Sequence, residues 1–145
     1  YVNDSRDPGG ETNFGICKRA YPALDIKALT RRDAISIYQR DYWTAAKCPL
    51  LPPAVAAMHF DTAVNQGVGA AARLLQEAAG TGVDGKIGPA TLAAVGRKDV
   101  QTLLNEYAAR RALRYAGTAN FDRFGLGWLR RLTACLSICN TILKE

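Results

Sequence analysis

The amino-acid sequence predicts a mainly α protein with an irregular or short β-hairpin lobe at its N-terminus. Its 145 residues suit a single domain, and a domain of this size buries roughly 68–70% of its unfolded surface. After residue 30, apolar residues recur at helical spacing in most segments. The first 20 residues are instead rich in glycine, proline and polar side chains, which are typical of turns.

The N-terminal lobe contains few helix-forming signals. Pro8, Gly9 and Gly10 form a turn signal, and Gly15 permits a positive φ angle. We expect an irregular loop or a short β-hairpin here, leading into a brief helix near residues 13–20.

Capping and breaking residues predict the first two long helices. Thr30 followed three residues later by Asp33 is a capping-box pattern, and apolar residues at helical spacing continue to residue 45. Prolines at positions 49, 52 and 53 end that segment and open a helix over about 53–66, which Gly67 ends.

Similar signals divide the rest of the chain. We expect helices over 69–79, over a short segment from Pro89 to Gly96, from Asp99 as an N-cap onward, and over about 125–143. We assign residues 1–48 to an N-terminal lobe and residues 49–145 to a helical region, together forming one compact unit.

Charge and composition limit the classes of function. The net charge is +6 and the pI is about 9.4, which suits a polyanionic partner such as nucleic acid, an anionic membrane or a bacterial wall. No run of about 18 apolar residues exists, so we expect no membrane insertion. Two arginine clusters on the last two long helices predict solvated helix faces. They are Arg110, Arg111 and Arg114, and Arg130 and Arg131.

The cysteines and the single histidine give no metal-binding pattern. No CxxC pair occurs and His59 is alone, so we expect no metal and no cofactor. His59 suits a core or boundary position. Cys135 and Cys139 are four apart in an apolar helical pattern, which predicts two buried thiols on one face. The sequence does not decide whether Cys17 and Cys48 form a disulfide.

Asp7 and Thr12 flank the Pro-Gly-Gly turn, which can hold their side chains close together. A carboxylate and a hydroxyl on one water molecule can orient and deprotonate it, as the general base of an inverting glycosidase requires. Turn formation alone is the alternative for both residues. The other half of such a site is a carboxylic acid with a raised pKa.

The stretch YVNDSRDPGGETNFGI resembles the N-terminal motif of glycoside hydrolase family 108, the lysozyme-like N-acetylmuramidases of phages and Gram-negative bacteria. That motif is E-G-G-Y, five residues, then D-x-G-G-x-T-x-x-G-I. The residues that match it are Tyr1, Asp7, Gly9, Gly10, Thr12, Gly15 and Ile16. The resemblance implies a lysozyme-like fold in which Asp7 and Thr12 position the water.

The family's catalytic glutamate falls three positions before Tyr1, outside this sequence. By resemblance it is the general acid, so residues 1–145 alone are expected to lack the proton donor and to be inactive. Glu11 is expected to be a surface carboxylate, because a solvated glutamate keeps a pKa near about 4.3.

The resemblance continues through PAVAAMHFDTAVNQGVGAAARLLQEAAG and VDGKIGPATLAAV, which look like the family's predicted peptidoglycan domain. We expect substrate contacts from Asn13, Tyr42, Trp43, Asp61 and Asn65. Asp61 and Asn65 either line a glycan groove or fix their helix to the N-terminal loop. One of Tyr42 and Trp43 is expected in the core and the other as a stacking platform. Asp84 and Gly85 are expected to form a turn.

These features predict a peptidoglycan-degrading muramidase that hydrolyses the β-1,4 bond between N-acetylmuramic acid and N-acetylglucosamine, and we expect an inverting general acid/base mechanism. The alternative is a non-catalytic peptidoglycan-binding module. A helical DNA binder is disfavoured, since the arginine clusters lie on separate helices. We expect a monomer that binds peptidoglycan and no nucleic acid, in the periplasm or outside the cell at the wall.

Overall fold

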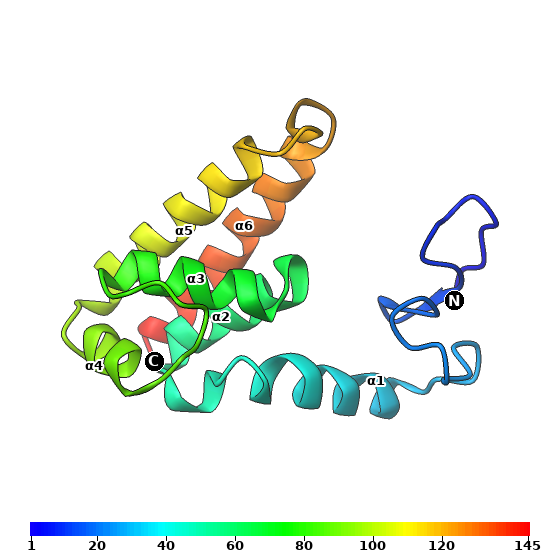
Figure 1. Ribbon diagram of the computed structural model, residues 1–145, viewed down its shortest axis with the longest axis horizontal. Coiled ribbons are helices and arrows are strands. Elements are labelled where there is room, and N and C mark those ends of the chain that lie inside the picture. Colours follow the sequence, from blue (N-terminus) through cyan, green and yellow to red (C-terminus); the bar gives the residue numbers. More distant parts are fainter. The chain divides into compact units, whose positions relative to one another are not determined.

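The computed structural model describes all 145 residues and groups them into two units, Tyr1–Arg40 and Asp41–Glu145. The first unit contains the strands β1 (Thr12–Asn13) and β2 (Ile16–Cys17) and the helix α1 (Arg31–Tyr38). The second contains the helices α2 to α6 (Figure 1). The mainly α, lysozyme-like fold predicted from the sequence is confirmed. The chain passes from the first unit to the second between Arg40 and Asp41, whereas the sequence suggested a boundary after residue 48.

A two-stranded antiparallel hairpin forms the middle of the first unit. Thr12 pairs with Cys17 and Asn13 pairs with Ile16. The two residues between the strands, Phe14 and Gly15, both have left-handed backbones, with φ of 54° and 78°. The brief helix predicted near residues 13–20 is therefore wrong, because strand pairing and a left-handed turn occupy that segment.

The hairpin and α1 share a small core. Ile16 of β2 is buried together with Ile26, Ala34 and Ile37. The predicted capping box at the start of α1 is confirmed, since the Thr30 hydroxyl accepts a hydrogen bond from the Asp33 amide and the Asp33 carboxylate accepts one from the Thr30 amide. The helical path then widens into a π-helical segment, η1 (Gln39–Thr44).

In the second unit, turn and capping residues fix the helix ends. A short 3₁₀ turn, η2 (Cys48–Leu50), precedes α2 (Pro53–Gln66), which starts with proline as predicted. Gly67, with φ of 95°, ends α2 and directly precedes α3 (Val68–Ala79). The bounds of the remaining helices are Pro89–Gly96 for α4, Val100–Ala116 for α5 and Phe121–Leu143 for α6.

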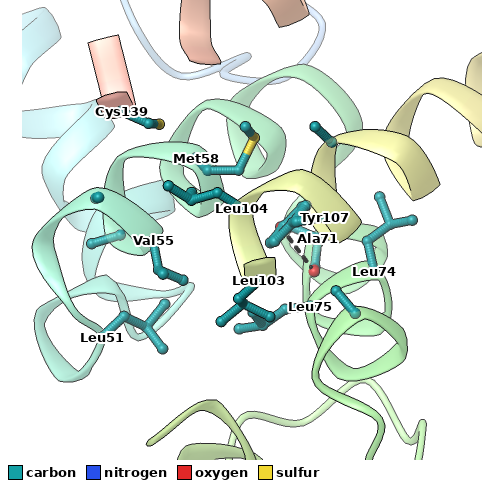
Figure 2. Close-up of a cluster of buried hydrophobic side chains, with 14 of the residues drawn as sticks. Leu51, Val55, Met58, Ala71, Leu74, Leu75, Leu103, Leu104, Tyr107 and Cys139 are labelled. Atoms are coloured by element: carbon teal, nitrogen blue, oxygen red, sulfur yellow. Dashed lines mark hydrogen bonds between the residues drawn. The ribbon is translucent and has the colours of Figure 1, made fainter. Parts of the chain in front are cut away.

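The main core lies where α2 packs against α3, α5 and α6. Figure 2 shows leucine, valine and methionine side chains from α2, α3 and α5 meeting around Tyr107. Cys135 and Cys139 are buried, as predicted, and all four cysteines are free thiols. None of the helices is both long enough and apolar enough to cross a membrane.

His59 of α2 is fully buried in this core, as expected. Its Nε2 faces the Ala46 carbonyl at 3.0 Å and therefore carries the proton. Its Nδ1 lies 2.8 Å from the Tyr107 hydroxyl, whose one proton is shared between this nitrogen and the Ala71 carbonyl at 3.2 Å. Burial lowers the pKa of His59 to about 4, and the Ala46 contact only partly offsets this.

Candidate functional site

Asp7 lies in the tight turn that the Pro-Gly-Gly segment predicted. Its Oδ1 accepts a hydrogen bond from the Gly9 amide at 2.8 Å, and its carbonyl accepts one from the Gly10 amide at 3.0 Å. The carboxylate is exposed, and Oδ2 has no hydrogen-bond partner in the protein. One oxygen therefore fixes the side chain while the other is open to solvent or substrate.

Thr12 and the turn that carries Asp7 both lie next to Cys17 in the first unit. Thr12 pairs with Val2 on one side and with Cys17 on the other, and directly paired residues point to the same face of a sheet. A Cβ atom on Gly9 would lie 3.2 Å from Asp7 Oδ1 and 3.6 Å from Cys17 Cβ. Gly9 therefore lies between the Asp7 carboxylate and Cys17, the strand partner of Thr12.

The other carboxylates of this segment have partners of their own. Asp4 forms an exposed ion pair with Arg6 at 2.9 Å, and hydrogen bonds from the Arg6 side chain and amide lower the pKa of Asp4. The Tyr1 hydroxyl donates to Glu11. Asp7 and Thr12 differ from them, because the Thr12 hydroxyl and one Asp7 oxygen bind no protein group.

Asn13 holds the hairpin to the loop before α1. Its Nδ2 donates to the Ile26 carbonyl at 3.1 Å and to the Leu29 carbonyl at 3.4 Å. Both amide protons are therefore directed at the protein backbone. The arrangement fixes the strand that carries Thr12.

In the second unit, Tyr42 and Trp43 of η1 are both half-buried and both pack against the main core. The Trp43 ring meets Phe60 of α2 edge to face, with 5.7 Å between centroids. Trp43 also lines an apolar groove of about 740 Å³ between α2 and the C-terminal half of α6. Asp61 and Arg131 are the charged groups of that groove. Few groove atoms could bond sugar hydroxyls.

Asp61 joins three helices through two arginines. Its Oδ2 accepts a bond from Arg111 of α5 at 2.7 Å, and its Oδ1 accepts one from Arg131 of α6 at 3.1 Å. Burial alone would raise the pKa of Asp61, but the bonds from Arg131 and Arg111 outweigh it and lower the pKa. Asn65 accepts a hydrogen bond from the Tyr115 hydroxyl. Both Asp61 oxygens and the Asn65 Oδ1 therefore face protein groups.

The prediction of a solvated arginine face is wrong at Arg111, whose side chain is 0% exposed. Besides Asp61, it bonds Tyr115 at 3.0 Å and Thr62 at 3.1 Å. Those bonds compensate the charge that burial would otherwise penalise. The helical spacing contained a signal for this, because Arg111 continues the buried stripe of Leu104, Tyr107 and Ala108.

Gln76 of α3 is a further organising residue that sequence reasoning missed. Its Oε1 accepts bonds from the Asp84 and Gly85 amides at 3.1 and 2.9 Å, and its Nε2 donates to Asp84 Oδ1 and the Lys86 carbonyl at 2.8 and 2.9 Å. The predicted Asp84–Gly85 turn is confirmed, with φ of 79° at Gly85. The Gln76 side chain lowers the pKa of Asp84.

Comparison with known proteins agrees with these features. Residues 1–67 match the family model described as Glycosyl hydrolase 108, and residues 70–133 match the Predicted Peptidoglycan domain. The solved structure of SagA from Brucella abortus is 33% identical and superposes with a TM-score of 0.90, over 100% of this chain and 88% of SagA. No curated protein sequence matches significantly. The chain therefore belongs to the glycosyl hydrolase 108 family and carries a predicted peptidoglycan domain, so its function is directed at peptidoglycan.

Proposed function

We propose that this protein contributes the water-activating half of a muramidase site, which hydrolyses the β-1,4 bond between N-acetylmuramic acid and N-acetylglucosamine. The observation that supports this most is that the turn carrying Asp7 packs against Cys17, which is the strand partner of Thr12. Asp7 and Thr12 each offer a polar group without a partner in the protein. Glycosyl hydrolase 108 membership supports the reaction class.

In the proposed mechanism, the Thr12 hydroxyl and Asp7 Oδ2 hold one water molecule. Asp7 removes its proton as the oxygen attacks the anomeric carbon, while an acid on the opposite side of the sugar protonates the leaving oxygen. This is the geometry of inversion. The Gly9 amide keeps the Asp7 carboxylate oriented for this step.

We propose that the proton donor of this mechanism is the glutamate that the resemblance to the family motif implies three positions before Tyr1. Such an acid needs a partly apolar environment that raises its pKa toward the working pH. The activity test therefore uses the encoded protein with that segment included.

For the glycan contacts, we retain Tyr42 and Trp43 as candidate stacking residues. Asn13, Asp61 and Asn65 have polar groups bonded to protein partners. We therefore propose that these three act on the substrate indirectly, by fixing the elements that carry other residues. The positive net charge of +6 favours approach to the anionic wall.

We further propose that the protein is a monomeric, bacteriolytic enzyme of the endolysin type, acting in the periplasm or outside the cell. Family membership and the predicted peptidoglycan domain support the wall as its place of action. Sedimentation of the purified protein measures its oligomeric state.

The experiment compares wild type, Asp7→Asn and Thr12→Ala by clearing of cell walls and by release of reducing ends. Asp7→Asn keeps an oxygen for the Gly9 amide but removes the base, so we expect a loss of about 10²–10⁴-fold in rate. Asp4→Asn is the matched control, because Asp4 lies in the same segment and pairs with Arg6. Equal clearing by both site variants and wild type overturns the assignment. The anomer released, followed by NMR, tests inversion.

The match to a predicted peptidoglycan domain over residues 70–133 favours one second candidate, a non-catalytic wall-binding module. This candidate predicts that the protein pellets with purified peptidoglycan but releases no reducing ends, even with the upstream segment present.

A further inference from the structure

Phe14 occupies a turn position that its side chain does not favour. It is the first residue of the two-residue turn between β1 and β2, with φ of 54°. Turns of this kind require left-handed backbones at both positions and prefer Asn-Gly or Asp-Gly. A bulky residue there is a conformational outlier. The turn alone does not explain why phenylalanine is present.

Burial does not explain it either. The Phe14 residue is 47% exposed and is not part of the small core formed by Ile16, Ile26, Ala34 and Ile37. Its ring forms no contact with another aromatic ring, unlike Trp43 or Trp128. An exposed ring in a strained backbone gains little stability for the fold. Strained residues of this kind concentrate at functional sites.

The strained turn is nevertheless held firmly. The Tyr38 hydroxyl of α1 donates to the Phe14 carbonyl at 2.8 Å. A Cβ atom on Gly15 would lie 2.6 Å from that same hydroxyl, so only glycine fits beside it. Asn13 fixes the other side of the turn through Ile26 and Leu29. The hairpin thus presents the ring from a backbone with little freedom.

Thr12 lies two residues before Phe14 on the same hairpin. We propose that Phe14 is a substrate-contact residue, whose ring stacks on a pyranose ring of the glycan strand next to the bond held at Asp7 and Thr12. This inference rests on the proposed function. Aromatic rings suit the apolar C–H face of a sugar, and a ring held by a rigid backbone loses little entropy on binding.

Because this turn prefers asparagine, one substitution can remove the ring without destabilising the turn. Phe14→Asn removes the ring but places the residue type that the left-handed position prefers. A structural role for the ring predicts a lower melting temperature. A substrate-contact role predicts an equal or higher melting temperature together with weaker substrate binding.

The experiment measures kcat, KM and melting temperature on the encoded protein with soluble peptidoglycan fragments. For Phe14→Asn we expect KM to rise about 2- to 10-fold, with a smaller change in kcat. Phe14→Tyr keeps the ring and is expected to recover most of the affinity. Phe124→Asn removes a similarly exposed ring from α6 and is expected to leave KM unchanged. A Phe14→Asn variant with unchanged KM overturns the proposal, whatever its melting temperature.

The outcome separates this inference from the proposed function. Asp7→Asn is expected to reduce kcat and leave KM nearly unchanged, the reverse of Phe14→Asn. If wild type releases no reducing ends, the muramidase proposal fails, and Phe14 is then tested by pelleting with peptidoglycan. Weaker pelleting of Phe14→Asn than of Phe124→Asn supports the glycan contact, and equal pelleting overturns it.

Discussion

Asp61 of α2 and Arg111 of α5 form an ion pair of 2.7 Å, in which the arginine side chain is 0% exposed and the carboxylate 27% exposed. The buried charge of Arg111 is therefore neutralised by a carboxylate 50 residues earlier in the chain. Removing one member of such a pair leaves the other buried and uncompensated. This relation makes Asp61 a structural residue of the second unit.

We expect Asp61→Asn to lower the free energy of unfolding by about 3 kcal/mol. Arg131→Ala is the control, because the Arg131 side chain is 42% exposed and an exposed partner contributes at most about 1 kcal/mol. Urea unfolding followed by tryptophan fluorescence measures both, since Trp43 and Trp128 lie in the second unit. Similar losses for the two variants would contradict the structural role of the Asp61–Arg111 pair.

The buried His59 predicts a dependence of stability on pH. Its folded pKa of about 4 lies below its ordinary value of 6.5, so between these pH values only the unfolded chain binds the proton. The free energy of unfolding therefore falls as the pH falls from about 6.5 to 4, by about 3 kcal/mol in total.

His59→Gln tests this, because glutamine keeps a donor for the Ala46 carbonyl but does not titrate. Urea midpoints are measured at pH 4.5, 5.5 and 7 for both proteins. We expect the wild-type midpoint to fall more steeply toward acid than that of the variant. Parallel profiles would show that His59 does not contribute.

Gln76 predicts a local effect on the loop before α4. In Gln76→Met the side chain has similar length but no polar atoms, so the Asp84 and Gly85 amides lose their acceptor. We expect a loss of about 2 kcal/mol and at least roughly tenfold faster hydrogen exchange at the Gly85 amide. Gln101→Met is the control, since Gln101 bonds only the exposed Asn105. Unchanged hydrogen exchange at the Gly85 amide would contradict the role of Gln76 in holding this loop.

Asn13 predicts a difference between two small substitutions. Asn13→Ala removes the two bonds to the Ile26 and Leu29 carbonyls and is expected to cost about 1 kcal/mol. Asn13→Asp points a carboxylate at the same carbonyls and is expected to be worse at neutral pH, with partial recovery below about pH 4 as it gains a proton. Hydrogen exchange at the Lys18 amide, which bonds Glu11 across the hairpin, measures both. Exchange at the wild-type rate in both variants contradicts the anchoring role, and Asn3→Ala serves as the control.

Local chemistry predicted much of the fold. Thr30, Pro53, Gly67 and Asp99 mark helix ends in the structure at the positions where the sequence indicated them. Capping and helix breaking act over a few residues, so the sequence carries them directly.

Interactions between distant residues could not be predicted in this way. The partner of Arg111 is Asp61, and the charges of a helix do not reveal which of them a distant carboxylate neutralises. The hairpin was missed as a definite element because its turn places phenylalanine where asparagine is usual. In the candidate site, the sequence indicated Asp7 and Thr12, but it did not show that Asn13 bonds the backbone.

Gly67 connects α2 to α3 without an intervening loop. The first family match ends at this residue and the second begins at residue 70, yet α2 supplies Val55 and Met58 to the core shared with α3 and α5 (Figure 2). A gene fragment that starts after Gly67 would encode the predicted peptidoglycan domain without α2, which forms one side of its hydrophobic core. A recombinant fragment that is to keep this core must therefore include α2 as well as residues 70–133.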